Sequence, residues 1–299
     1  MINKEYKDRL FKAIFGNEEH RNWTLALYNA VNGSDYDDPS KIEFNTIENA
    51  VYLGMHNDVS FILYGIVSLY EQQSTFNPNM PVRLLMYLGK VYDRYITAGK
   101  YNLYGSKLIE LPVPKLVVFY NGLKDEPDEV ILELSDAFPK ELREASDVQV
   151  QVRMLNINSG KNENLLSSCR PLMEYSWLID RIRTNRQTME IENAVDRALE
   201  EMPEDFEIRD FLIGNRAEVR DMCITEYNEE ETMQMFKEEG KEEGIKIGEA
   251  RGKEKGQEEL NSLYAYLQDS GRQDDLMKAI KDKEYREKLL AEFRAGKMK

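Results

Sequence analysis

Two acidic residues and a glutamine stand at positions where they could form a metal-binding and catalytic cluster. Asp58 begins one strand-like stretch, and Glu71 and Gln73 end the next one. Because side chains alternate along a strand, Glu71 and Gln73 should point to the same face. Charged side chains seldom lie in an apolar run unless they are paired or bind a metal. The two carboxylates and the backbone carbonyl of Gln72 would supply the oxygen ligands that Mg²⁺ or Mn²⁺ prefers.

The stretch between these residues predicts how they are brought together. Residues 59–70 are rich in β-branched and aromatic side chains and are interrupted by Gly65, which predicts two strands joined by a tight turn. Asp58 and Glu71 are thirteen positions apart, which suits a strand, a turn and a returning strand. We therefore expect a hairpin that places Asp58 alongside Glu71.

A set of short motifs surrounds the two carboxylates. In chain order they occupy residues 8–15, 57–61, 71–75, 79–87, 111–122 and 134–138. Together these motifs resemble the recombination-promoting nuclease family of bacterial transposase-like proteins. The resemblance covers residues 4–183, and the glycine-spaced C-terminal tail is similar to that family in style only.

The resemblance implies a PD-(D/E)xK fold, which is an α/β restriction-endonuclease-like core. It also implies a metal-dependent endonuclease, a hydrolase that cuts DNA with little sequence preference and is linked to DNA recombination or transposition. Matched by motif, Asp58 and Glu71 would be metal ligands and Gln73 would take the position of the usual lysine. Asn57 stands where the motif has proline. Gln73 carries no positive charge, but its amide could orient the attacking water.

Three further residues are candidates for contacts around the site. Lys12 and Arg83 are the basic residues that we expect to reach the phosphate backbone of DNA. Asp8 is a candidate for holding a second metal ion or its water. Each has an alternative, because Lys12 and Arg83 could be solvated helix residues. Asp8 could be an acidic residue favoured by the dipole at the start of a helix.

The three central residues also have structural alternatives. Asp58 could cap a turn, as aspartate commonly does. Glu71 could form an ion pair with Arg83 or Lys12. Gln73 could satisfy buried backbone groups.

The remaining elements follow from hydrophobic periodicity and from proline and glycine. Besides the hairpin, strands are predicted at residues 42–47, 51–53, 115–120 and 148–157. Helices are predicted at residues 4–15, 18–31, 80–96, 260–267 and 276–293, and over most of 171–220 with breaks at Pro203 and Gly214. This order predicts a mixed sheet flanked by helices, with a helical C-terminal extension.

The net charge of −15 argues against a simple nucleic-acid binder. Its distribution changes that interpretation. Residues 1–122 hold 12 Lys and Arg against 13 Asp and Glu, whereas the rest of the chain holds 28 against 42. The part of the chain that carries the candidate site is therefore nearly neutral, and a bound divalent cation would make it more positive.

The C-terminal tail has a glycine every four residues, from Gly240 to Gly256. Glycine costs roughly 1 kcal/mol per helical position relative to alanine, but this period aligns the glycines along one helix face. The tail is either a solvated, partly ordered linker helix or a self-association element. We expect a nuclease-like core at residues 1–185, a helical extension at 186–230 and this tail at 231–299. The tail is the candidate oligomerisation element of a homo-oligomer.

Cysteine content, apolar runs and the first residues of the chain together indicate its cellular compartment. Cys169 and Cys223 are too few for a disulfide framework or a zinc site, and they fit a reducing cytoplasm. The longest apolar runs fall well short of the roughly 20 residues that a membrane-spanning helix needs. The first residues do not resemble a secretory signal. We therefore expect a cytoplasmic protein that does not cross a membrane.

Two other classes of function stay open. The chain could be a nuclease-fold protein with weak or no activity that acts as a DNA-binding or assembly module. The missing lysine at Gln73 and the acidic second part of the chain favour this class. The chain could also be an oligomeric scaffold that assembles through its tail.

Overall fold

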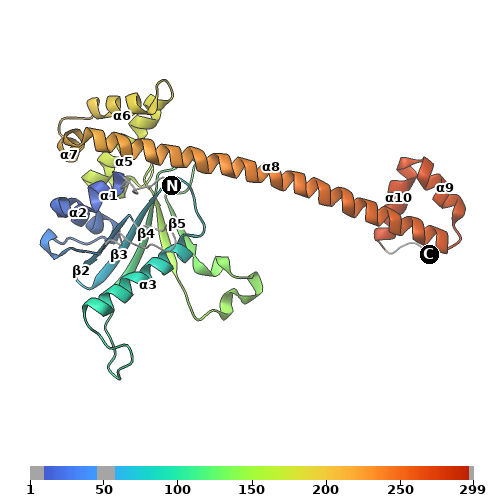
Figure 1. Cartoon of the computed structure of the whole chain (residues 1–299), viewed down its shortest axis with the longest axis horizontal. Helices are drawn as coiled ribbons and strands as arrows, with labels where there is room; N and C mark the ends of the chain where they lie inside the picture. The colour runs from blue at the N-terminus through green and yellow to red at the C-terminus, as the bar shows by residue number, and fades with distance from the viewer. Residues whose placement is uncertain (1–9, 46–57, 296–299) are drawn as a thin grey trace, which may run out of the picture. The chain divides into compact units, whose positions relative to one another are not determined.

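The computed structural model describes residues 10–45 and 58–295 of the chain. Its strands form one mixed sheet in the order β1-β2-β3-β4-β6-β5 (Figure 1). The strands are β1 Glu43–Phe44, β2 Val59–Leu63, β3 Ile66–Gln73, β4 Val113–Tyr120, β5 Glu129–Glu133 and β6 Gln151–Asn156.

The first three strands form an antiparallel meander, and β4 lies parallel to β3. The helix α3, Met80–Ala98, supplies the crossover that a parallel pair requires. β6 is parallel to β4, and β5 is antiparallel to β6 at the edge of the sheet. The C-terminal ends of β3, β4 and β6 therefore share one edge of the sheet.

The chain divides into two compact units, Met1–Glu230 and Glu231–Lys299. Besides α3, the α-helices are α1 Leu10–Phe15, α2 Arg21–Asn32, α4 Glu163–Ser168, α5 Arg170–Arg186, α6 Ile191–Glu200, α7 Arg209–Gly214, α8 Arg216–Asp269, α9 Gln273–Lys281 and α10 Lys283–Arg294. Short 3-10 helices are η1 Glu18–His20, η2 Pro39–Lys41, η3 Leu134–Ala137 and η4 Lys140–Ala145.

Each face of the sheet has its own hydrophobic core, as the alternation of β3 side chains dictates. Tyr70 belongs to the core formed with α1, α2 and α5. Val67 and Leu69 belong to the core formed with α3. Figure 1 shows α3 across one face of the sheet and α1, α2 and α5 on the other side. The sheet is thus a central layer between helices, and the chain has an α/β fold.

The sequence of α3 explains both its start and its orientation. Pro81 stands in the first turn, where its missing N–H costs no hydrogen bond. The buried residues recur at helical spacing, so one side of the helix faces the sheet. They are Met80, Pro81, Leu84, Tyr87, Leu88 and Val91.

Several predicted elements are confirmed within unit 1. The hairpin, α2, α3 and the strands β4 and β6 lie where the pattern places them, with boundaries shifted by a few residues. Of the helix predicted at 4–15, residues 10–15 are seen as α1. Residues 4–9 and the strand predicted at 51–53 lie outside the described residues. The pattern did not predict β5. This edge strand has exposed acidic residues at both ends, Glu129 and Glu133, and only Leu132 is buried.

The C-terminal helices form a small unit of their own. α8 continues without a break from Arg216 to Asp269, through all five spaced glycines. The end of α8 packs with α9 and α10 around Leu263, Leu267, Ala279 and Leu289. The prediction of a single helix at 276–293 was wrong, because the structure has two helices there. Asp282 separates α9 from α10, and its side chain caps α10 by accepting a hydrogen bond from Tyr285 N.

Two further properties were found for the described part of the chain. None of its helices combines the length and the hydrophobicity needed to cross a bilayer. Cys169 and Cys223 are buried free thiols. Burial raises the pKa of Cys169 to about 12, so this thiol is held in its protonated form.

Candidate functional site

The hairpin of β2 and β3 sets the geometry of the candidate site. Tyr64 and Gly65 form its two-residue turn with φ of 46° and 78°, the positive values of a type I′ turn. The register pairs Val59 with Tyr70, so one further step places Asp58 opposite Glu71. Residues opposite each other in an antiparallel pair project on the same face. The carboxylates of Asp58 and Glu71 therefore lie side by side on the face that α3 covers.

Asp58 is fixed by the neighbouring strand. Its side chain is buried, with 5% exposed, and its Oδ2 accepts a hydrogen bond from Gln72 N at 2.6 Å. In a strand the N–H and C=O of one residue point to the same side. The carbonyl of Gln72 therefore faces the Asp58 side of β3, as a third metal ligand would require.

Glu71 is the more deeply buried of the two acids, with 1% of its surface exposed. Its Oε1 lies 2.7 Å from Arg83 Nη2, and the Arg83 side chain is 27% exposed. The other end of the guanidinium, Nη1, lies 3.5 Å from Met80 Sδ. Arg83, which we expected at the phosphate backbone, is thus directed at Glu71 in this structure. This is the ion pair that the sequence offered as an alternative for Glu71.

Tyr87 of α3 lies in the same cluster, one turn after Arg83. Burial raises its pKa, and the negative charges of Glu71 and Asp58 act in the same direction. Hydrogen bonding and charge from Arg83 oppose that rise. Tyr87 is thus within electrostatic range of both carboxylates.

The other face of β3 carries a chain of buried amides and a phenol. Gln72 Nε2 donates to Asn121 Oδ1 at 2.7 Å, and Asn121 Nδ2 donates to Tyr175 Oη at 3.3 Å. Burial raises the pKa of Tyr175 well above its ordinary value, and the carboxylates of Glu226 and Asp58 add to the rise. This chain joins β3 to the end of β4 and to α5, so it fixes the backbone that presents Glu71.

Gln73 ends β3 and is partly buried. Strand alternation places its side chain on the face of Glu71, as the sequence predicted. Its carbonyl accepts a hydrogen bond from Asn121 N at 3.1 Å. The amide therefore stands next to Glu71 at the end of the strand.

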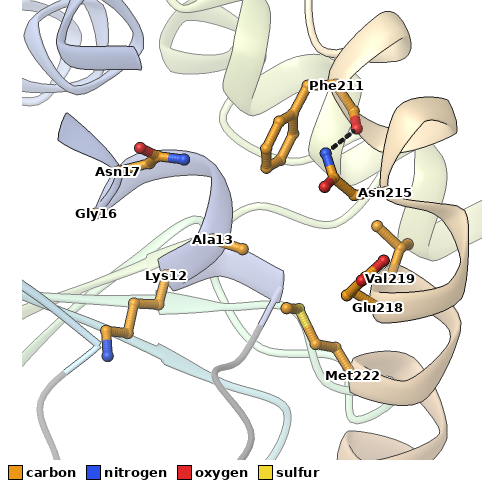
Figure 2. Close-up of a pocket in the computed structure, with 9 residues that line it drawn as sticks. All are labelled: Lys12, Ala13, Gly16, Asn17, Phe211, Asn215, Glu218, Val219 and Met222. Carbon is orange, nitrogen blue, oxygen red and sulfur yellow. Dashed lines mark hydrogen bonds between the residues drawn. The ribbon is translucent and has the colours of Figure 1, made fainter. Parts of the chain in front are cut away.

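Lys12 lies on the opposite side of the sheet from Arg83. It belongs to α1 and lines a pocket of about 340 Å³ between α1 and the segment of α7 and α8. Figure 2 shows its side chain extending away from Phe211 and Asn215. The side chains of Lys12 and Val59 both lie beside Gly16. A Cβ added at Gly16 would be 3.2 Å from Lys12 Cγ and 3.5 Å from Val59 Cγ2. The stem of Lys12 thus passes near the residue that follows Asp58.

The structure accordingly brings Asp58, Glu71, Gln72 and Gln73 together at one end of the hairpin. It does not bring Lys12 and Arg83 onto a common surface. Asp8 lies outside the described residues. Tyr87, Asn121 and Tyr175 were missed by sequence reasoning. Only Asn121 left a signal, because Asn-Gly closes a buried strand at the same edge as Glu71.

The chemistry of these groups can be compared with the needs of a divalent cation. Two carboxylates and a carbonyl are hard oxygen ligands, and Mg²⁺ is commonly held by one or two carboxylates with water in its other positions. Among the described residues, no group of three or more His, Cys, Asp or Glu could hold a metal ion. The oxygen groups of the cluster that could hold such an ion are the carboxylates of Asp58 and Glu71 and the carbonyl of Gln72.

In comparisons with known proteins, no family model, no curated protein and no solved structure matches the chain.

Proposed function

We propose that this chain is a divalent-metal-dependent endodeoxyribonuclease of the PD-(D/E)xK type, related to the recombination-promoting nuclease family. The observation that carries the proposal is the pair of buried carboxylates, Asp58 immediately before β2 and Glu71 on β3, one step beyond the Val59–Tyr70 pair. Buried acids are rare unless they are paired or bind a metal. The mixed sheet flanked by helices also agrees with the fold that the sequence motifs imply.

In the proposed reaction, a water molecule attacks the phosphorus of a DNA phosphodiester, and the bond to the leaving oxygen breaks. Asp58 and Glu71 would hold Mg²⁺ or Mn²⁺ together with the Gln72 carbonyl. The bound ion would lower the pKa of a coordinated water and offset the charge on the phosphate. The Gln73 amide would orient the attacking water by hydrogen bonding. Such contacts leave the bases unread, which agrees with cutting of low sequence preference.

The test is plasmid nicking and linearisation by the purified full chain with Mg²⁺, Mn²⁺, Ca²⁺ or EDTA. We expect cutting with Mg²⁺ or Mn²⁺ only. Asp58→Ala and Glu71→Ala should lower the rate by at least about 100-fold, since even partners of metal ligands are worth 10- to 100-fold. Glu71→Gln keeps the shape of the side chain and separates lost chemistry from lost folding. If neither substitution lowers the rate of DNA cutting, the site is misassigned.

Two observations favour a second candidate, a nuclease-fold protein that binds DNA without cutting it. Gln73 stands in place of a lysine, and Arg83 already neutralises Glu71 at 2.7 Å. This candidate predicts DNA binding in the same buffers without any product that depends on metal. The plasmid assay combined with a binding assay distinguishes the two functions.

We further propose a cytoplasmic protein that associates with itself through its C-terminal unit and acts in DNA recombination or transposition. The two free thiols support a reducing compartment. The spaced glycines of α8 support self-association, because a Cβ added at any of them would meet nothing within 4 Å. A second helix could therefore approach this face closely.

A further inference from the structure

One flank of α3 carries a line of basic residues. Arg83, Lys90 and Arg94 are separated by seven and four positions, which correspond to about two turns and one turn of an α-helix. The three therefore project in nearly the same direction, beside the face that packs on the sheet. Lys90 is half-buried and Arg94 is exposed. At 1.5 Å per residue they lie roughly 10 and 16 Å along the axis from Arg83.

The basic line continues into the loop after α3. Lys100 and Lys107 are exposed there, together with Tyr104, which is 98% exposed. In Figure 1 this loop extends from the C-terminal end of α3 beyond the sheet. Residues 80–115 hold six basic and two acidic residues, in a chain whose net charge is −15. This stretch therefore carries an excess of four positive charges in an acidic protein.

The line starts at the candidate site. Arg83, its first member, donates to Glu71 at 2.7 Å, whereas Lys100 lies past the other end of the helix. A polyanion that follows the line would therefore have one end at the two carboxylates. The acidic residues of the rest of the chain would repel the same polyanion elsewhere.

We propose that the flank of α3, with Lys90, Arg94 and the Lys100–Lys107 loop, is the surface along which duplex DNA lies when one of its phosphates is at the site. This inference rests on the proposed nuclease function. Lys90 and Arg94 contact successive phosphates of one strand and hold the duplex in register with Asp58 and Glu71. Contacts of this kind position DNA without reading its sequence.

The test is fluorescence anisotropy of a labelled duplex of about 30 base pairs with the full chain in Ca²⁺ or EDTA, over a range of salt. Each phosphate contact contributes roughly 0.9 to the slope of log K against log salt. The double variant Lys90→Gln/Arg94→Gln should therefore bind at least about tenfold more weakly at moderate salt, with a slope smaller by about 1.8. The matched control Lys41→Gln/Lys140→Gln removes two exposed lysines outside α3 and should change neither quantity.

The outcomes separate this surface from the nuclease itself. If the wild type binds and cuts DNA but the α3 variant binds with unchanged affinity and slope, the surface is wrong and the nuclease proposal stands. Equal weakening by the control pair would also overturn the surface, because the effect would then come from overall charge. A wild type that neither binds nor cuts DNA would overturn both.

Discussion

At the scale of single residues, the site is governed by a competition for Glu71. A buried carboxylate needs a positive partner, because water is excluded from it. Arg83 supplies that partner in the structure, at 2.7 Å, and a bound divalent cation would supply it in the proposed enzyme. Arg83 contacts one of the two oxygens of this carboxylate, Oε1, so a cation bound at Glu71 would be repelled by the positive guanidinium beside it. Arg83 stands at the start of the basic line of α3, where a phosphate could take it up instead.

This competition predicts that Arg83→Met binds metal more tightly than the wild type. A partly exposed ion pair is worth about 1 kcal/mol, so removal of the competitor should raise Mn²⁺ affinity by roughly fivefold. Electron paramagnetic resonance of free Mn²⁺, without DNA, measures this change directly. Arg83→Lys keeps a cation at the position and should remain close to the wild type. An Arg83→Met variant with wild-type or weaker affinity would show that Arg83 and the metal do not compete.

At the scale of elements, the β2–β3 turn decides whether the two carboxylates meet. A slip of one residue in the register would turn every side chain of a strand to the other face, and Asp58 would no longer face Glu71. Gly65 holds the turn because it takes φ of 78°, which costs other residues roughly 1–2 kcal/mol. The tight turn is thus part of the site although it lies at the far end of the hairpin.

We therefore expect opposite effects from two glycine-to-alanine changes. Gly65→Ala should lower the free energy of unfolding by roughly 1 kcal/mol or more, because alanine resists positive φ. Gly89→Ala lies inside α3, where an added Cβ meets nothing within 4 Å, and should stabilise the chain by up to about 1 kcal/mol. Urea unfolding followed by circular dichroism compares them. Equal effects of the two changes would mean that the turn conformation carries no stability.

The elements that the sequence predicts well are those in which local pattern and tertiary packing agree. The hairpin combines alternating apolar residues with a turn glycine, and α3 combines a helical apolar face with Pro81 in its first turn. The edge strand β5 was not predicted, because four of its five residues are not buried and acidic residues flank its apolar centre. A helical tail was expected, but its continuity with the helix that begins at Arg216 was not, because glycine propensity argues against an unbroken helix.

The same reasoning separates the predicted and unpredicted parts of the site. Asp58, Glu71 and Gln73 are close in sequence, so strand periodicity and one turn are enough to place them. The direction of the Arg83 side chain depends on how α3 packs on β3. The sequence alone therefore could not decide between a phosphate contact and an ion pair with Glu71. Tyr175 reaches Asn121 from a helix that begins some fifty residues later, and only the tertiary fold brings such a contact about.

At the scale of the whole molecule, charge is distributed very unevenly. Residues 123–230 hold 13 basic and 26 acidic residues, whereas residues 231–299 hold 15 and 16. The acidity therefore belongs to the second half of unit 1 and not to the tail. Long-range repulsion from this half would keep DNA from most of unit 1 and favour approach along α3. The nearly neutral tail has no comparable barrier against a second copy of itself.

The last prediction concerns a chain that ends at Asn228. The large core of unit 1 is completed by residues up to Tyr227, so the truncated chain should fold and keep the proposed DNA cutting. If the tail drives self-association, sedimentation velocity should show an oligomer for the full chain and a monomer for the truncated one. Gly244→Leu/Gly248→Leu keeps the full length but blocks close approach of a second helix, and it should sediment like the truncated chain. An oligomer that survives truncation would instead place the contact in unit 1, and the glycines of α8 would then need another explanation.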